Sequence, residues 1–261
     1  MYLRTEIFKA ELAYIKSAVI REFTAKIIDI LPEYFFEVPA SSTGKYHPDY
    51  ALGDGGLVRH TKAAVNIAYQ LMQLEQCSFT QDEKDLIISA LIAHDGLKSG
   101  VEKQTYTVAD HPLQVVNFVS SHEEIKNLIS EDYYTVWSNA IASHMGQWNT
   151  DYKTKQEILP KPSTSVEKFV HMCDYIASRK DWTFNFPDGY YQPAQFETPD
   201  PIDYLIDSII TLCKKHIANG VDRTTLYSLI ASYNNGNKNP ASIKDVGVAN
   251  TILDKLEEIG K

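Results

Sequence analysis

Apolar side chains recur at intervals of three and four residues through most of the first 180 positions of this 261-residue chain. Such intervals place side chains on one stripe of an α-helix, whereas a half-buried strand alternates at every second residue. Strand-like alternation is scarce in the chain. The sequence therefore predicts an all-α fold, with helices near residues 4–30, 57–75, 81–95, 111–120, 122–130, 132–145, 164–180, 201–219, 222–233 and 247–259.

Three of the predicted helices begin with the signature of a capping box. In this motif a hydroxyl side chain and a carboxylate three residues later each accept a hydrogen bond from the first backbone N–H groups of a helix. The signatures are Thr80 with Glu83, Ser121 with Glu124, and Thr164 with Glu167. They predict helix starts close to these positions.

The composition of the sequence changes after Lys180. The segment "DWTFNFPDGYYQPAQFETPDP" is rich in aromatic residues and proline, and helical periodicity resumes only after it. We expect residues 1–182 to form one domain that includes the N-terminal helix. Residues 183–261 are expected to form a helical, aromatic-rich C-terminal extension, which either covers the core or stands as a small module of its own.

Charge and cysteine content narrow the classes of protein that the chain can represent. The 25 Lys and Arg residues against 34 Asp and Glu give a net charge of -9, which argues against a broad surface for polyanionic nucleic acid but leaves room for a local basic groove. Three widely spaced cysteines suggest neither a disulfide framework nor a thiolate zinc site. No apolar run approaches the ~18 residues of a membrane span. We therefore expect a cytoplasmic protein that does not engage membranes.

Five of the predicted helices carry a metal-competent side chain on their apolar stripe. His60, for example, heads a stripe that continues through Ala64 and Ile67. Because the stripe faces the core, each of these side chains points inward. The inward set is His60, His94, His111, His144 and Asp174, with Asp95 beside His94.

A single inward histidine is most often a core residue with a satisfied hydrogen bond, but the set as a whole indicates a metal site. Burying Asp95 and Asp174 without a partner would be very costly, whereas buried charges that coordinate a metal are tolerated. Nitrogen and oxygen ligands without thiolate suit Mn, Fe, Co, Ni or Zn better than Ca or Mg. Such a site best serves the hydrolysis of a phosphate ester or anhydride.

Four local motifs appear in a fixed order: "GGLVRHT" around His60, "AHDGLKSG" around His94 and Asp95, "IASHMGQW" around His144, and "VHMCDYIASRK" around Asp174. Their order resembles the H…HD…D signature of the HD-domain metal-dependent phosphohydrolases, over roughly residues 40–181. The resemblance implies an HD-domain helical bundle in which His60, His94, Asp95 and Asp174 bind one divalent metal. In members with two ions the residue at the place of Asp95 bridges them, and His111 and His144 match the places of the second ion's ligands. The sequence therefore resembles a member with two ions, and two divalent transition-metal ions are expected. If His111 does not bind, one ion remains.

The same resemblance suggests residues that contact substrate. Lys98 stands where the family carries the lysine of HDxxK, which implies that it supports catalysis together with Asp95 and contacts phosphate; a solvated lysine at a helix end is the alternative. Arg179 and Lys180 could engage phosphate, or could simply favour the C-terminal end of their helix. His171, three residues before Asp174, is a candidate for a hydrogen bond that supports a ligand.

The loop "ASSTGKYHPDY" before the first motif is similar to the small-residue, histidine-containing loop of the HD-type 3′–5′ exoribonucleases. This similarity makes Lys45 and His47 candidate substrate contacts, and a surface turn is the alternative.

Three functions remain open from the sequence. The first is a metal-dependent phosphohydrolase in which a metal-bound hydroxide cleaves a phosphate ester or anhydride of a nucleotide or similar small phosphorylated substrate. The second is a 3′–5′ exonuclease or phosphodiesterase acting on short oligonucleotides, although no separate nucleic-acid-binding module is evident. The third is a non-catalytic binding or sensor protein of the same fold, with the aromatic tail as a partner surface. The sequence does not predict an oligomeric state.

Overall fold

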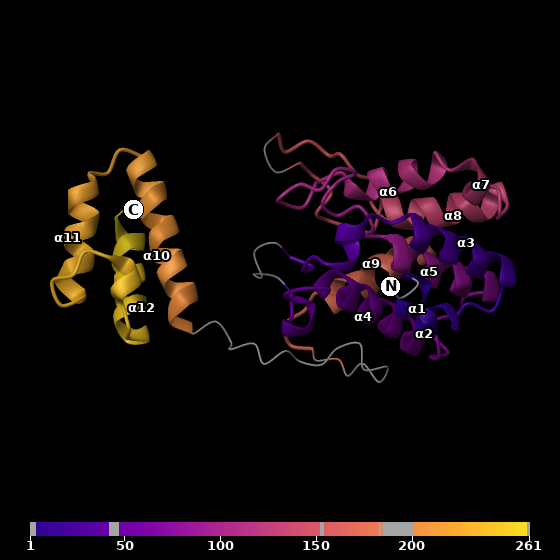
Figure 1. Ribbon diagram of the computed structural model, residues 1–261, viewed down its shortest axis with the longest axis horizontal. Helices are drawn as coiled ribbons and strands as arrows, with labels where there is room; N and C mark the ends of the chain where they lie inside the picture. The colour runs from indigo at the N-terminus through magenta and orange to yellow at the C-terminus, as the bar shows by residue number, and fades with distance from the viewer. Residues whose placement is uncertain (1–3, 42–46, 152–153, 183, 185–200, 260–261) are drawn as a thin grey trace. The chain divides into compact units, whose positions relative to one another are not determined.

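The computed structural model describes residues 4–41, 47–151, 154–182, 184 and 201–259 (Figure 1). Within these residues the secondary structure is helical, and the one strand-like feature is an isolated antiparallel bridge between Thr150 and Glu157. The predicted all-α fold is confirmed. The chain divides into two compact units, Met1–Gln192 and Pro193–Lys261. Because residues 185–200 lie outside the described part, the predicted boundary after residue 182 and the aromatic character of the extension stay predictions.

The first unit contains nine α-helices and two 3-10 turns in its described residues. The α-helices are α1 (Arg4–Ile7), α2 (Lys9–Leu12), α3 (Ala18–Ile30), α4 (Gly56–Leu71), α5 (Gln81–Ala93), α6 (His111–Ser120), α7 (Glu123–Lys126), α8 (Glu131–Ala142) and α9 (Ser165–Ala177), and the turns are η1 (Glu33–Phe36) and η2 (Asp49–Ala51). Helix α5 packs against α3, α4, α8 and α9, and the stretch from Asp85 to Leu97 is buried throughout. A helix enclosed on all sides is apolar all round, which explains why the run before His94 is so hydrophobic.

Two of the three predicted capping boxes are present. At the start of α5, the Thr80 hydroxyl accepts a hydrogen bond from the Glu83 N–H at 3.2 Å, and the Glu83 carboxylate accepts one from the Thr80 N–H at 2.8 Å. Thr164 and Glu167 form the same box at the start of α9. The box predicted at Ser121 is wrong. Ser121 still caps the end of α6, and its hydroxyl donates backwards to the Phe118 carbonyl at 2.7 Å.

The single helix expected over residues 4–30 is interrupted at Phe8, between α1 and α2, and again between α2 and α3. The buried carboxylate of Asp85, from α5, accepts hydrogen bonds from the backbone N–H groups of Lys16 at 3.0 Å and Ser17 at 2.6 Å. These N–H groups are therefore directed across the core rather than along a helix. The Ser17 hydroxyl then caps α3 by accepting from the Ile20 N–H.

The described part of the second unit is a group of three helices, coloured orange to yellow in Figure 1. These are α10 (Pro201–Ala218), α11 (Arg223–Tyr233) and α12 (Val246–Glu258), with the turn η3 (Pro240–Ser242) before the last. Its buried core includes Ile209, Leu226, Ile230 and Ile252. Across the described residues of both units, every helix is too short or too polar to cross a membrane.

Candidate metal centre

The structure brings all six predicted ligand residues together. His60 lies in α4, His94 caps the end of α5 and Asp95 follows it, His111 opens α6, His144 follows α8, and Asp174 lies in α9. Five of the six are at most 2% exposed, whereas the Asp174 side chain is 18% exposed. We refer to these residues as the six-residue cluster.

Three of the histidine rings are oriented by hydrogen bonds to their own helices or turns. In each ring Nδ1 lies close to the carbonyl oxygen three residues earlier: His94 at 2.7 Å from Leu91, His111 at 2.7 Å from Val108, and His144 at 2.8 Å from Ile141. Because a carbonyl oxygen only accepts, Nδ1 must carry the proton in all three rings. In the neutral imidazole, the lone pair is then on Nε2, which is how histidine presents itself to a metal.

The first ligand set consists of His60, His94 and Asp174 together with the Oδ2 atom of Asp95. His60 Nε2 lies 2.9 Å from Asp174 Oδ1 and 3.7 Å from Asp95 Oδ2. His94 Nε2 lies 3.5 Å from each of the same two oxygens. All four side chains therefore present one ligand atom to a common point.

The second ligand set consists of His111 and His144 together with the Oδ1 atom of Asp95. Asp95 Oδ1 lies 3.0 Å from His111 Nε2 and 3.8 Å from His144 Nε2, and the two Nε2 atoms are 3.4 Å apart. The two oxygens of the Asp95 carboxylate thus face different pairs of histidines. A carboxylate in this arrangement could contribute one oxygen to each of two metal sites.

The geometry of both sets fits divalent cations. Ligand atoms that surround one ion at about 2.0–2.2 Å are separated from their neighbours by roughly 2.9–3.6 Å, which is close to the spacings observed here. Within the described residues, Nε2 of His94 has no hydrogen-bond partner although it is buried. A lone pair on Nε2 that faces a carboxylate oxygen is repelled unless a proton or a cation lies between them. His60, His94 and Asp174 form one group that could hold a metal, and His94, Asp95 and His144 form another.

The electrostatics of the cluster keep its carboxylates ionised. Burial alone would raise the pKa of Asp95, but Lys98 and His94 hold it well below its usual value of 3.8. The pKa of Asp174 is likewise held well below its usual value, because the hydrogen bond to His60 and the nearby His94 outweigh burial. Burial lowers the pKa of His144 to about 3. At neutral pH the cluster therefore offers two carboxylates and a neutral His144.

His94 differs from His144 because it lies between the two carboxylates. Burial alone would lower the pKa of His94, but the negative charges of Asp95 and Asp174 raise it above its usual value. The negative potential that favours a proton on His94 Nε2 also favours a metal cation there, and the cation would have to displace that proton.

Lys98 points into the cluster. Its Nζ atom lies 2.6 Å from Asp95 Oδ2, and its side chain is 14% exposed. The side chains of Lys98 and Asp174 are therefore the solvent-accessible edge of an otherwise buried site. The interpretation of Lys98 as a solvated lysine at a helix end does not match this position.

His47 lies beside the first ligand set. Its ring centroid is 5.0 Å from that of His60, and its Nδ1 atom is buried without a hydrogen-bond partner in the described residues. Burial, with Lys98 and His60 nearby, lowers the pKa of His47 to about 2. The ring is therefore neutral and close enough to the cluster to meet a ligand there. Lys45, the other candidate in this loop, lies outside the described residues.

Arg179 and Lys180 are not brought into the cluster. The Arg179 guanidinium lies 4.2 Å from the ring centroid of Tyr175 and donates a hydrogen bond to the Ser178 hydroxyl at 2.7 Å. Lys180 is exposed. Both positions suit cations at a helix C-terminus, and their roles toward substrate stay predictions.

One supporting residue was anticipated and another was missed. His171 Nδ1 donates to the His144 carbonyl oxygen at 2.6 Å, which ties α9 to the turn that carries His144. Gly146 makes this contact feasible, because a Cβ atom at that position would lie 2.2 Å from the His171 ring. Gly146 also has a φ of +59°, a conformation that favours glycine. The only sequence signal for it is a glycine two residues after a predicted ligand.

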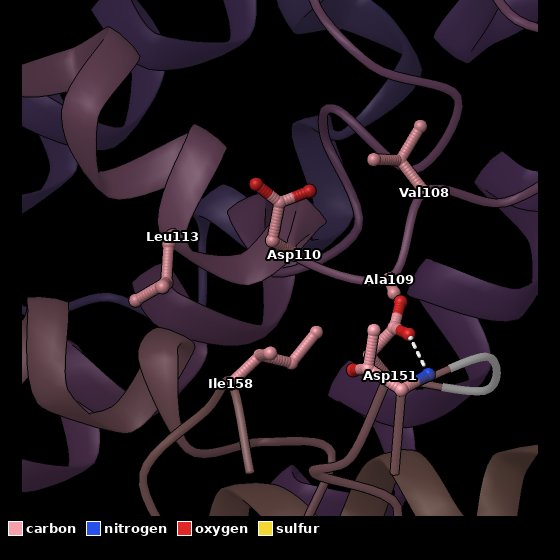
Figure 2. Close-up of a pocket in the computed structure, with 7 residues that line it drawn as sticks. Val108, Ala109, Asp110, Leu113, Asp151 and Ile158 are labelled. Atoms are coloured by element: carbon pink, nitrogen blue, oxygen red, sulfur yellow. Dashed lines mark hydrogen bonds between the residues drawn. The ribbon is translucent and has the colours of Figure 1, made fainter. Parts of the chain in front are cut away.

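A surface pocket of about 530 Å³ lies where the chain enters α6 (Figure 2). It is lined by Val108, Ala109, Asp110, Leu113, Asp151, Thr154 and Ile158. The Asp151 carboxylate accepts a hydrogen bond from the Thr154 N–H at 2.7 Å. Figure 2 draws a dashed line at the labelled Asp151. The Asp110 carboxylate accepts from the Gln114 amide at 3.0 Å. Both acidic groups are therefore engaged locally, and the pocket contains no member of the six-residue cluster.

Comparisons with known proteins do not add to this picture. The chain matches no family model, no curated protein and no solved structure. The geometry of the six-residue cluster is therefore the evidence that bears on its function.

Proposed function

We propose that the chain is a metal-dependent phosphohydrolase of the HD type, acting on a phosphate ester or anhydride of a nucleotide or similar small phosphorylated molecule. The observation that carries the proposal is the Asp95 carboxylate, whose two oxygens lie 3.0 Å from His111 Nε2 and 3.5 Å from His94 Nε2 respectively. Divalent transition metals held by the two ligand sets would lower the pKa of bound water and polarise a phosphoryl oxygen.

Residues of the chain would orient the ligand rings, bind phosphate and exclude water. The hydrogen bonds from Nδ1 of His94, His111 and His144 fix each ring with its Nε2 lone pair toward the cluster. Lys98, at the accessible edge, supplies a positive charge to a phosphate oxygen that approaches from solvent. The buried surroundings exclude bulk water and strengthen each of these electrostatic interactions.

The charge of the chain favours a small substrate over long nucleic acid. A protein of net charge -9 repels a long polyanion, whereas a single phosphate group needs only a local positive site such as Lys98 beside the cluster.

The test combines metal analysis with an activity screen. Purified protein is analysed for bound metal, and nucleotides, cyclic nucleotides, dinucleotides and short oligomers are assayed with Mn, Co or Ni. We expect bound metal and phosphate release, both lost in Asp95→Ala and retained in Asp110→Asn, a nearby aspartate outside the cluster. Absence of bound metal together with absence of hydrolysis in every metal rules out the proposal. Nucleotide binding without turnover in metal-loaded protein favours a sensor instead.

The exonuclease alternative is supported by one exposed feature beside the cluster's helices. Trp148 and Tyr175 are 49% and 36% exposed, and their rings are nearly parallel, with centroids 5.6 Å apart and an interplanar angle of 14°. Exposed stacked aromatic rings with an adjacent Arg179 are the type of surface on which unpaired bases stack. Product analysis on labelled short RNA and DNA separates the alternatives, because an exonuclease releases mononucleotides in a ladder and loses activity on oligomers in Trp148→Ala.

A further inference from the structure

A second pocket adjoins the cluster on the side of Lys98. Its volume is about 340 Å³, at the lower end of the roughly 300–1,000 Å³ typical of ligand sites, so it suits part of a ligand rather than a whole large one. One wall is apolar and comes from residues 38–40, and the other is polar and comes from the loop 98–107. The lining residues are Val38, Pro39, Ala40, Lys98, Ser99, Lys103, Gln104, Thr105 and Thr107.

The polar wall is held in place by backbone hydrogen bonds. The Gln104 N–H donates to the Ser99 carbonyl at 2.8 Å, and the Val108 N–H donates to the Lys98 carbonyl at 2.9 Å. The first bond closes the inner part of the loop, and the second joins its two ends. The buried hydroxyl of Tyr34 donates to the Gly100 carbonyl at 2.6 Å and anchors the loop to η1. The pocket is therefore preformed, which reduces the entropic cost of binding a ligand.

The chemistry of the lining selects an anion. Among the described residues that line it, two are lysines, three carry hydroxyls, one carries an amide and none is a carboxylate. Lys98 is paired with Asp95 behind the lining, so Lys103 supplies the local positive charge, in a chain of net charge -9. Ammonium and hydroxyl groups are donors to phosphate oxygens, and hydrogen bonds between charged partners are the stronger ones.

Lys98 connects the pocket with the six-residue cluster. It lines the pocket, and its Nζ atom lies 2.6 Å from Asp95 Oδ2. A phosphate group at the cluster and a second anionic group in the pocket would therefore both be within reach of Lys98, and Lys103 would contact the second group alone.

We propose that this pocket binds a second phosphate group of the substrate, so that the substrate carries a chain of at least two phosphates. The proposal rests on the proposed function for the position of the first phosphate, at the cluster. Lys103 is the residue that distinguishes a diphosphate from a monophosphate. The phosphate chain belongs either to a nucleoside polyphosphate or to an inorganic polyphosphate, and assays with ADP and with inorganic pyrophosphate distinguish the two.

The test measures binding with probes that are not hydrolysed. Methylenediphosphonate and orthophosphate are titrated calorimetrically into wild-type protein, Lys103→Gln and Lys168→Gln, with Mn and separately with a chelator, against matched blanks. Lys168 is an exposed lysine of α9 that does not line the pocket. We expect Lys103→Gln to weaken diphosphonate binding about tenfold, the effect of losing one hydrogen bond between charged groups, and to change orthophosphate binding less than about twofold. Lys168→Gln should change neither.

Equal loss for both probes in Lys103→Gln, or no loss for either, overturns the proposal. The kcat/KM values for ADP and AMP provide a second measurement, and only the ADP value should fall in Lys103→Gln. If inorganic pyrophosphate is cleaved as well as ADP, the pocket recognises the phosphate chain alone. Diphosphonate binding that depends on Lys103 in a protein without hydrolytic activity would remove the proposed function and leave the pocket assignment. Hydrolysis of ADP and AMP with no preference between them would overturn the pocket assignment and leave the proposed function.

Discussion

Asp95 Oδ1 lies 3.0 Å from His111 Nε2, on the opposite side of the carboxylate from the oxygen that contacts Lys98. This relationship places His111 in the second ligand set. We expect His111→Ala to reduce the bound metal from two ions to one per chain, because the first ligand set keeps all its members. Metal content by elemental analysis measures this directly. His122→Ala is the matched control, since His122 bonds to the Phe118 carbonyl away from the cluster. Two ions in His111→Ala would remove His111 from the site.

The His171 contact behind His144 should tune metal affinity without touching the metal. Removing a group that orients a ligand typically weakens metal binding 10–100-fold. We expect about this loss in His171→Ala, measured by competition with a chelator, with the metal stoichiometry unchanged. Unchanged affinity would show that the His144 carbonyl contact is incidental.

Gly146 permits the contact between His171 and the His144 carbonyl. Replacing Gly146 should therefore lower the free energy of unfolding by more than backbone strain alone would. Gly146→Ala forces a left-handed conformation on alanine and also places Cβ 2.2 Å from the His171 ring. Gly236→Ala imposes similar strain at a φ of +82° with nothing within 4 Å, and is the matched control. We expect Gly236→Ala to cost about 1 kcal/mol and Gly146→Ala clearly more, in urea unfolding. Equal losses would mean that His171 moves aside freely.

The buried ion pair between α4 and α2 should contribute strongly to the stability of the N-terminal segment. Lys62 Nζ lies 2.9 Å from a carboxylate oxygen of Glu11, and both side chains are at most 3% exposed. We expect Lys62→Met to lower the free energy of unfolding by about 3–5 kcal/mol, because it removes the lysine that pairs with the buried Glu11 carboxylate. The double variant Glu11→Leu, Lys62→Met should recover much of that loss. A single variant as stable as wild type in urea unfolding would contradict this account.

The contribution of the Glu167 capping box to the free energy of unfolding should depend on pH, and the direction of that dependence follows from the pKa of Glu167. Burial alone would raise the pKa of Glu167, but hydrogen bonds from the Ser163 and Thr164 backbone and hydroxyls lower it below its usual value of 4.5. A lowered folded-state pKa adds stability above pH 4.5, and that stability is lost as the pH falls through the folded-state pKa. We expect Glu167→Gln to cost about 1 kcal/mol at pH 7 and progressively less below pH 4.5. A pH-independent difference between the two proteins would contradict the assignment.

The residues of the cluster could be predicted from the sequence because they carry two independent signals. Each of His60, His94 and His144 lies on an apolar stripe, which fixes its inward direction, and the order of the motifs then groups helices that are distant in the chain. The structure brings these residues together, while their roles as ligands remain predictions.

The features that were missed depend on contacts between distant segments. The break after α2 is caused by Asp85, whose N–H partners at Lys16 and Ser17 lie 69 and 68 positions away, so local periodicity predicts an unbroken helix. The pocket beside Lys98 is formed by an irregular loop and by residues 38–40. Irregular backbone has no period, and its lining cannot be inferred from spacing.

The most direct test of the central claim is anomalous diffraction from crystals of the protein grown with Mn. The account predicts two peaks about 3.5–4 Å apart, one on each side of the Asp95 carboxylate. The first peak should lie among His60, His94 and Asp174, and the second should lie against His111 and His144. A single peak in the first set would reduce the site to one ion. No peak at Asp95, in crystals that hold Mn elsewhere, would contradict the account.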